Sequence, residues 1–416
     1  MHSRKKALEV LLAVILIFSF CLVACGGGGS VPATVIEEED EPLSSVKLEA
    51  FMDYLVKKNK KHLAAMSVSV FTREDVLLEK AYGYASIVDR VLNDADTVFE
   101  WGSISKLLVW VSAMQLYEQG MLDLDVDIRT YLPNDMLTDL KYNVTMINLM
   151  SHSAGWPTEL PTEVWLIPEE EDAPTLEDGL KSVEIFQTYE PGTKKEYSNY
   201  GASLAGFIVE RISGEPFWQY VHENIFDPLG MTQTALRPDL SDNAWVKAQR
   251  GKLRCYTGAK WDLGALIYQM PTLYPAGMAT GTITDLRKFA QALIPDENGV
   301  SVLFERAETL AEMYTPIPYS DPSVAPQFCH GFIIISQSSL GNYDLLRDID
   351  VLGHDGMTAG CATLMAYSID YGFGVAVMTN QSAERLESQH DKHPRDFPYF
   401  ASLDFWIPIY LKAKNS

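Results

Sequence analysis

Cysteine is scarce in this chain of 416 residues, which contains only five. Two of them, Cys21 and Cys25, lie near the N-terminus, and the other three are Cys255, Cys329 and Cys361. Three cysteines allow at most one intramolecular disulfide, so the chain is not a disulfide scaffold and its stability must come from a packed core. The sequence leaves open whether any two of the three pair.

Basic residues are also in the minority. The chain has 33 Lys and Arg against 56 Asp and Glu, which gives a formal net charge of −23 at pH 7. An acidic surface repels phosphate backbones, so nucleic acid is not expected as a partner. The shares of hydrophobic residues (47%) and charged residues (21%) are ordinary for a globular protein. The composition therefore indicates a folded domain.

Several common catalytic signatures are missing. The chain has no HExxH helix, no Gly-rich phosphate loop and no GxSxG elbow, which argues against a metalloprotease, a nucleotide enzyme and an α/β-hydrolase. Its eight histidines are scattered, and the isolated pair Cys329-His330 is expected in the core or a loop rather than at a metal site. We expect neither a metal nor an organic cofactor.

Only one long apolar run is present, and it lies at the N-terminus. It extends from Ala7 to Ala24 and follows the basic residues Arg4, Lys5 and Lys6, an order typical of a secretory signal. The run ends in Leu22-Val23-Ala24-Cys25, which resembles the bacterial lipobox, a signal whose cysteine is acylated and becomes the new N-terminus. We therefore expect residues 1–24 to be a lipoprotein signal peptide and Cys25 to be the lipidation site.

Residues 25–44 are expected to form a flexible acidic tether. Four glycines follow Cys25, and Gly/Ser-rich segments are flexible, while the run Glu37–Glu41 is a solvated acidic stretch. The alternative is an uncleaved signal anchor, because about 18 apolar residues can span a membrane. The cysteine at the cleavage position favours lipidation. This predicts an extracytoplasmic protein, lipid-anchored to a bacterial membrane.

The remaining residues, 45–416, are expected to form one α/β (α+β) domain. Strand patterns occur near both ends of it, at 66–71, 76–81, 331–335, 362–366 and 373–378, and helical patterns occur at 48–59, 107–118, 204–212 and 218–225. This order predicts an antiparallel sheet flanked by helices, formed by about 45–105 and 270–416. A mostly helical insertion is expected at about 106–269, with a surface loop at 157–174.

Three short motifs carry the candidate chemistry. Ser103-Ile104-Ser105-Lys106 is SxxK, Tyr197-Ser198-Asn199 is YxN, and His354-Asp355-Gly356 is HxG. Each motif alone has an ordinary explanation: a serine N-cap, turn residues, or a histidine at the end of a strand. Two further SxxK copies, at 3–6 and 44–47, lie where no pocket can form. These separate explanations do not account for the occurrence of all three motifs in this order. They also do not explain why SxxK opens an apolar helix and HxG precedes a strand.

The residue types suit nucleophilic catalysis. A serine hydroxyl needs a neighbouring base to take its proton, and residues three apart on a helix share a face, so Ser103 and Lys106 can lie together. Burial can lower the pKa of a lysine toward the working pH. Tyr197 can share the proton, since a nearby ammonium favours its phenolate. Lys106 and Tyr197 are therefore the candidate bases, and the sequence leaves open which of them acts.

The motif set resembles that of the serine β-lactamase and penicillin-binding-protein-like superfamily, on the branch of class C β-lactamases, D-Ala-D-Ala carboxypeptidases and related esterases. Further signatures support the resemblance over roughly residues 48–380: Leu149–Gly155, Pro191-Gly192-Thr193, Pro228–Met231, Ala276-Gly277 and Thr284-Asp285-Leu286. The resemblance implies a β-lactamase/transpeptidase-like fold, with the active site between its sheet and helical parts.

The resemblance also implies roles for the motif residues. Ser103 would be the nucleophile, and the backbone N–H groups of Ser103 and Met357 would bind the oxyanion. Asn199 would orient Lys106 and a substrate amide, and His354, followed by Gly356, would face them from the edge strand. His152 is assigned to a structural turn.

The expected function is hydrolysis of an ester or amide bond, including that of a D-amino-acid peptide, through an acyl-Ser103 intermediate. A D-Ala-D-Ala carboxypeptidase or a β-lactamase is the alternative, and a non-catalytic lipoprotein that binds peptidoglycan or peptide is the alternative from another class. His354 stands where β-lactamases of the class usually have a permanently charged lysine, and Met357 where a hydroxyl residue is frequent. We therefore expect neutral esters or peptides to be better substrates than β-lactams.

Overall fold

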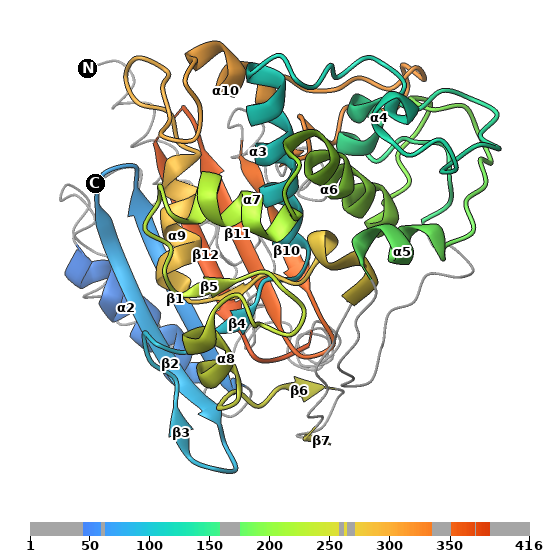
Figure 1. The fold of residues 1–416 in the computed structure, drawn as a ribbon. Coiled ribbons are helices and arrows are strands. Elements are labelled where there is room, and N and C mark those ends of the chain that lie inside the picture. The colour runs from blue at the N-terminus through green and yellow to red at the C-terminus, as the bar shows by residue number, and fades with distance from the viewer. Residues whose placement is uncertain are drawn as a thin grey trace.

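The computed structural model describes residues 45–59, 63–158, 175–257, 262–263, 271–334, 351–370 and 372–382 (Figure 1). The predicted signal peptide and tether, and most of the predicted loop at 157–174, lie outside these residues. Within them, no helix combines the length and the apolar character needed to cross a membrane.

A seven-stranded antiparallel sheet forms the framework. Its strand order is β3-β2-β1-β12-β11-β10-β9, so strands from the two ends of the domain pair at the centre, where β1 lies against β12. The strands are β1 (Ala65–Thr72), β2 (Val76–Ser86), β3 (Val91–Leu92), β9 (Ile333–Ile334), β10 (Leu352–Met357), β11 (Ala362–Ser368) and β12 (Phe373–Thr379). The predicted antiparallel sheet is confirmed, and β11 and β12 extend the predicted strands by one or two residues.

Helices cover both faces of the sheet. On β2, the side chains of Lys80 and Tyr82 bond to carboxylates of α2 (Ser45–Asn59), whereas Glu79 bonds to Thr284 and Arg287 on the other side. Neighbouring residues of a strand point to opposite faces. Therefore α2 and α9 (Ile283–Ala292), which carries Thr284 and Arg287, lie on opposite sides of the sheet.

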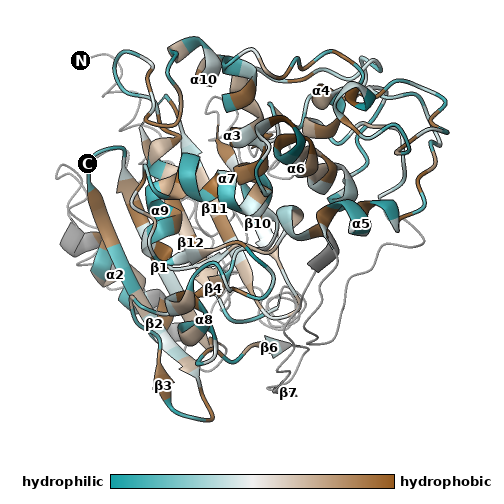
Figure 2. Ribbon diagram, viewed as in Figure 1, coloured by the Kyte–Doolittle hydropathy of each residue, from teal (hydrophilic) through white to brown (hydrophobic). Residues whose placement is uncertain are grey.

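A largely helical part lies between the two halves of the sheet in the sequence, and α3 and α6 pack against each other within it (Figure 1). Trp101 and Trp110 are fully buried here. Figure 2 shows brown, apolar residues along the strands and teal residues on outer helices such as α5. The helices are α3 (Ser105–Glu118), α4 (Met146–Met150), α5 (Leu176–Lys181), α6 (Asn199–Ser213), α7 (Phe217–Val221), α8 (Ala244–Arg250) and α10 (Ala307–Met313).

The helix ends explain where α6 and α7 begin and stop. The Ser198 hydroxyl accepts a hydrogen bond from Gly201 N–H at the start of α6, and Gly214, at φ +80°, ends it. The helix predicted at 218–225 is divided in the structure: α7 ends at Val221, and His222–Phe226 continues it as a π-helical turn.

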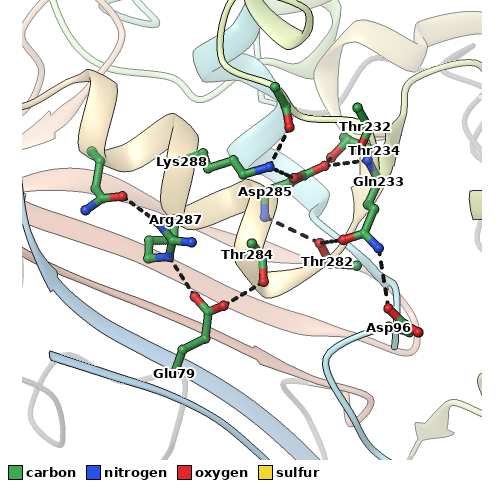
Figure 3. Close-up of polar contacts among 12 residues, drawn as sticks. Glu79, Asp96, Thr232, Gln233, Thr234, Thr282, Thr284, Asp285, Arg287 and Lys288 are labelled. Carbon is green, nitrogen blue, oxygen red and sulfur yellow. Dashed lines mark hydrogen bonds and ion pairs between the residues drawn. The ribbon is translucent and has the colours of Figure 1, made fainter. Parts of the chain in front are cut away.

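Buried polar contacts attach α9 to a small sheet of β4 (Phe99–Glu100), β8 (Thr280–Gly281) and β5 (Thr234–Ala235). Asp285 is fully buried, and its carboxylate accepts from Gln233 N–H at 2.7 Å and from the Thr234 hydroxyl at 2.9 Å (Figure 3). Lys288 Nζ lies 3.0 Å from the same carboxylate. A buried donor left without a partner costs about 1–3 kcal/mol, so Asp285 stabilises this attachment and gives the Thr284-Asp285-Leu286 signature a structural reason.

Candidate active site

Ser103 lies on a tight turn directly before α3. Gly102–Ile104 forms a 3-10 helical turn, and the Ser105 hydroxyl fixes it by donating to Gly102 O and accepting from Ala279 N–H. Trp101, Gly102, Ile104 and Ser105 are buried, whereas Ser103 is partly exposed. The turn thus presents the Ser103 hydroxyl at the surface of an otherwise closed segment.

Lys106 is fully buried and lies beside Ser103. Its Nζ is 3.0 Å from Ser103 Oγ, 2.8 Å from Asn199 Oδ1 and 2.6 Å from Ala276 O. The amide oxygen and the carbonyl oxygen can only accept hydrogen bonds. They therefore direct two N–H bonds of Lys106 away from Ser103 and leave the third position of the nitrogen facing the serine hydroxyl.

Tyr197 closes the other side of Lys106. Lys106 Nζ lies 4.9 Å from the centre of the tyrosine ring, and the hydroxyl of Tyr197 is buried. Behind the ring, His152 lies 4.3 Å away between ring centres, and its Nδ1 accepts from Ser198 N–H at 3.1 Å. Because Nδ1 is the acceptor, a neutral His152 carries its proton on Nε2. His152 is therefore part of the wall of the site as well as of a turn.

The protonation state of Tyr197 differs from the expectation. Burial raises the pKa of Tyr197 well above its ordinary value; the contact with Ser103 acts in the opposite direction, and the negative charge of Asp355 adds to the rise. The expectation that a nearby ammonium favours the phenolate is wrong, because removing the hydroxyl from water outweighs that effect. Tyr197 is a neutral phenol at neutral pH.

His354 is buried in β10, and its ring centre is 6.2 Å from that of Tyr197. Burial lowers the pKa of His354 to about 4, although the charge of Asp355 works against this shift. Its Nδ1–H donates to the backbone oxygen of Asp355. In the neutral ring Nε2 therefore carries no proton and is a hydrogen-bond acceptor. His354 therefore brings a hydrogen-bond acceptor to the site instead of a positive charge.

The position of β10 in the sheet corrects one detail. His354 was expected on the edge strand, but β9 lies outside β10 and pairs with Leu352 and Gly353. Beyond Gly353, the described residues pair β10 with β11 alone. HxG itself lies within β10, and the strand predicted after it is β11.

Two glycines bring β10 against the serine turn. A Cβ atom on Gly102, which has φ +54°, would be 2.6 Å from Met357 N, and one on Gly356 would be 1.9 Å from Trp101 O. Neither position has room for a side chain. The backbone N–H of Met357 is thereby held beside the turn that carries Ser103, while the Met357 side chain is 44% exposed. Gly356, expected among the substrate-binding and oxyanion residues, is buried where β10 packs against the serine turn.

Three site groups were not predicted as such. Ala276 belongs to the Ala276-Gly277 signature, for which no role was predicted. Its carbonyl is a backbone acceptor, and residue type does not reveal such an acceptor. His152 was assigned to a turn only. Lys195 lies close enough for its charge to lower the pKa values of His152 and His354, and its Nζ donates to Gln327 Oε1 at 3.1 Å.

The described residues contain no group of three or more His, Cys, Asp or Glu side chains placed to hold a metal ion. Cys329 and His330 are both buried. What the site brings together is a serine hydroxyl, a buried amine, a phenol and a backbone N–H group from β10.

Known proteins of this fold share the arrangement of elements. The solved β-lactamase/D-alanine carboxypeptidase from Yersinia pestis, in complex with citrate, covers 90% of this chain and 99% of its own, with a TM-score of 0.65 and 19% identity. EstCE1, "a hydrolase with promiscuous acyltransferase activity", covers 85% of this chain and 99% of its own, with a TM-score of 0.67 and 20% identity. These similarities identify the β-lactamase/transpeptidase-like fold.

The sequence comparisons agree. "Putative penicillin-binding protein PbpX" of Bacillus subtilis (strain 168) is 27% identical over 262 residues, which are 61% of this chain and 63% of that protein. The chain thus spans less than two thirds of that relative's length. The profile of the family described as Beta-lactamase matches residues 47–395, which is most of the chain. The chain belongs to the Beta-lactamase family.

Proposed function

We propose that the protein is a serine hydrolase that cleaves a neutral ester or amide bond through an acyl-Ser103 intermediate. The observation that carries the proposal is the 3.0 Å contact between Ser103 Oγ and the buried Nζ of Lys106. When Lys106 is a neutral amine, its two N–H bonds serve Asn199 Oδ1 and Ala276 O, and its lone pair faces the Ser103 hydroxyl. A buried amine in this arrangement is a general base for serine.

The proposed proton path begins with Lys106 as a neutral amine and Tyr197 as a neutral phenol. Lys106 takes the Ser103 proton as Oγ attacks the carbonyl carbon, and the new ammonium remains bound to Asn199 and Ala276. Tyr197, which is a neutral phenol, gives its proton to the leaving alcohol or amine and recovers one from Lys106. Water then attacks the acyl group and loses its proton to the same pair, which returns a proton to Ser103 Oγ as the bond between Oγ and the acyl carbon breaks and the acid is released. Lys106 is therefore the base in acylation, and Tyr197 is the acid.

The negative charge of the tetrahedral intermediate needs donors in place before the reaction. Ser103 N–H and Met357 N–H supply them in this proposal. The support is the contact of β10 with the serine turn at Gly102 and Gly356, where neither position accommodates a Cβ atom.

The substrate preference follows from the charge of His354. A neutral His354 and the thioether of Met357 offer no charge and no hydroxyl to a substrate carboxylate, which every penicillin and cephalosporin carries. We propose that neutral acyl esters are preferred substrates. The alternative to this proposal is a non-catalytic binding protein of the same fold.

Steady-state kinetics at neutral pH with a neutral acyl ester and a cephalosporin tests the preference. We expect a kcat/KM at least tenfold higher for the ester. A cephalosporin kcat/KM of about 10⁴ M⁻¹s⁻¹ or more without measurable esterase activity would contradict this interpretation of His354 and Met357. No turnover and no covalent adduct with any substrate would favour the binding protein.

A second candidate, release of a C-terminal D-amino acid, is favoured by Lys195. Lys195 lies two residues before Tyr197, and its charge acts on His354 together with that of Lys106; in this second proposal its ammonium binds the peptide carboxylate. A peptide ending in D-Ala-D-Ala, added to the same kinetic series, distinguishes this activity: hydrolysis that exceeds the esterase rate identifies the carboxypeptidase.

We further propose that the mature protein is held at the outer face of a bacterial membrane by a lipid on Cys25. The support is the sequence Leu22-Val23-Ala24-Cys25 with the Gly-rich segment after it. A Cys25→Ser variant is expected to be released into the soluble fraction or to remain as uncleaved precursor. A variant that is processed and retained in the membrane like wild type would show that another segment is the anchor.

A further inference from the structure

Two cysteines that have no part in the catalytic proposal face each other in the interior. The Sγ atoms of Cys255 and Cys361 are 3.9 Å apart, and the two residues are 3% and 0% exposed. Cys255 directly precedes β6 (Tyr256–Thr257), and Cys361 directly precedes β11. They are 106 positions apart in the sequence, so the fold itself brings them together.

The backbone next to Cys361 leaves space for the Cys255 side chain. A Cβ atom on Gly360 would lie 2.2 Å from the Cβ of Cys255, so Cys255 packs into space that only glycine leaves open. The third described cysteine, Cys329, is engaged elsewhere, since its Sγ donates to Tyr314 O at 3.0 Å. Cys255 and Cys361 are thus the described cysteines whose thiols meet.

We propose that Cys255 and Cys361 form a disulfide in the exported protein. Both are free thiols in this structure, and a disulfide requires sulfurs about 2.05 Å apart, so the two Sγ atoms have to approach from 3.9 Å. Disulfides form and persist in extracytoplasmic compartments, where the Cys25 anchor would place the domain. The bond itself does not depend on the hydrolase activity proposed above.

The reaction is an exchange with a dithiol–disulfide oxidoreductase. The Cys255 thiolate attacks one sulfur of the oxidoreductase disulfide and forms a mixed disulfide; the Cys361 thiolate then attacks Cys255 Sγ and releases the oxidoreductase as a dithiol. Two electrons and two protons pass from the cysteines to the oxidoreductase. The hydrogen bond from Cys361 and the Arg250 guanidinium, 3.7 Å from Cys255 Sγ, lower the pKa of Cys255.

The bond would join the two sides of the oxyanion site. On one side, Cys361 closes the turn after Met357, because Thr358 N–H donates to Cys361 O and Cys361 N–H to the Thr358 hydroxyl. On the other side, Arg250 next to Cys255 forms an ion pair with Glu100, which precedes Trp101 and the serine turn. A disulfide would therefore restrain Met357 N–H relative to Ser103 N–H, a consequence that rests on the function proposed above.

Peptide mapping of the full-length protein, purified from membranes without reductant, tests the bond. Free thiols are alkylated under denaturing conditions before trypsin digestion. We expect Cys255–Lys260 to be recovered linked to the peptide from Asp348 to Arg385, which holds Cys361, and Cys329 to be alkylated. Recovery of Cys255 and Cys361 as alkylated thiols, or of a bond that includes Cys329, would overturn the proposal.

Reduction tests what the bond does. We expect a reductant to lower the Tm by about 5 °C and to lower kcat for the ester roughly three- to tenfold, because a displaced oxyanion donor weakens transition-state binding. The Cys255→Ser variant should show both effects without reductant and no further response to it, whereas Cys329→Ser should respond like wild type. If kcat is unchanged on reduction, the disulfide does not position Met357 N–H relative to Ser103 N–H, even if the mapping shows that the disulfide exists.

Discussion

Loss of the Ser103 hydroxyl is expected to lower ester hydrolysis by about 10⁶-fold, the scale observed when the nucleophile of a serine–base unit is removed. Ser103 is the partly exposed member of a buried turn, and its Oγ is the atom that Lys106 reaches. Alanine removes the attacking atom and leaves the turn intact, because the Ser105 hydroxyl holds it. Steady-state kinetics of Ser103→Ala gives the measurement.

The matched control for Ser103 is Ser112→Ala on α3, the helix that follows the serine turn; the Ser112 hydroxyl donates to Leu108 O within α3. We expect this variant to retain activity within a few-fold of wild type. Hydrolysis by Ser103→Ala at the rate of the control would remove Ser103 from the mechanism.

Lys106→Ala has the second largest expected effect, a fall in kcat/KM of about 10²–10⁴-fold. The amine is held by Asn199 Oδ1 and Ala276 O so that it faces Ser103, whereas the buried Tyr197, whose pKa is raised, is the weaker candidate for the base. Tyr197→Phe should cost less than Lys106→Ala, since the phenol delivers a proton to the leaving group and does not activate the serine. The exposed Lys247→Ala on α8 is the control and should be as active as wild type.

The double variant Lys106→Ala/Tyr197→Phe should lose less activity than the product of the two single losses, because the two residues pass the same protons. Comparison of kcat/KM for the four proteins measures this coupling. Strictly multiplicative losses would mean that one of the two has no part in the proton transfers.

Periodicity predicted the long elements of the fold. The predicted helices Leu107–Glu118 and Leu204–Ile212 lie within α3 and α6. Both are apolar stretches of helical length followed by a glycine, Gly120 or Gly214, which is typical of a helix and its end. Periodicity did not predict the strand β10, which was expected from the resemblance alone: Leu352–Met357 contains two glycines and two polar residues, and its strand conformation depends on pairing with β11. The two-residue strands β4, β5 and β8 likewise depend on partners far away in the sequence.

The sequence predicted those parts of the site that side chains form. It did not predict the parts that depend on backbone groups or on burial. SxxK, YxN and HxG identified Ser103, Lys106, Tyr197, Asn199 and His354 by type and order. The Ala276 carbonyl has no side-chain signature. The protonation of Tyr197 and His354 depends on burial, which composition and spacing do not reveal: neighbouring charge suggested a phenolate, and desolvation reverses that conclusion.

Direct detection of the acyl-enzyme tests the central claim. Wild-type protein is mixed with a neutral ester whose acyl group leaves slowly, quenched with acid and digested with trypsin. The peptide Val91–Lys106 contains Ser103 and Ser105, and tandem mass spectrometry distinguishes them. We predict a stoichiometric acyl group on Ser103 that disappears on incubation with fresh buffer; turnover of the ester with no acyl group on this peptide, or with the group on another residue, would contradict the account.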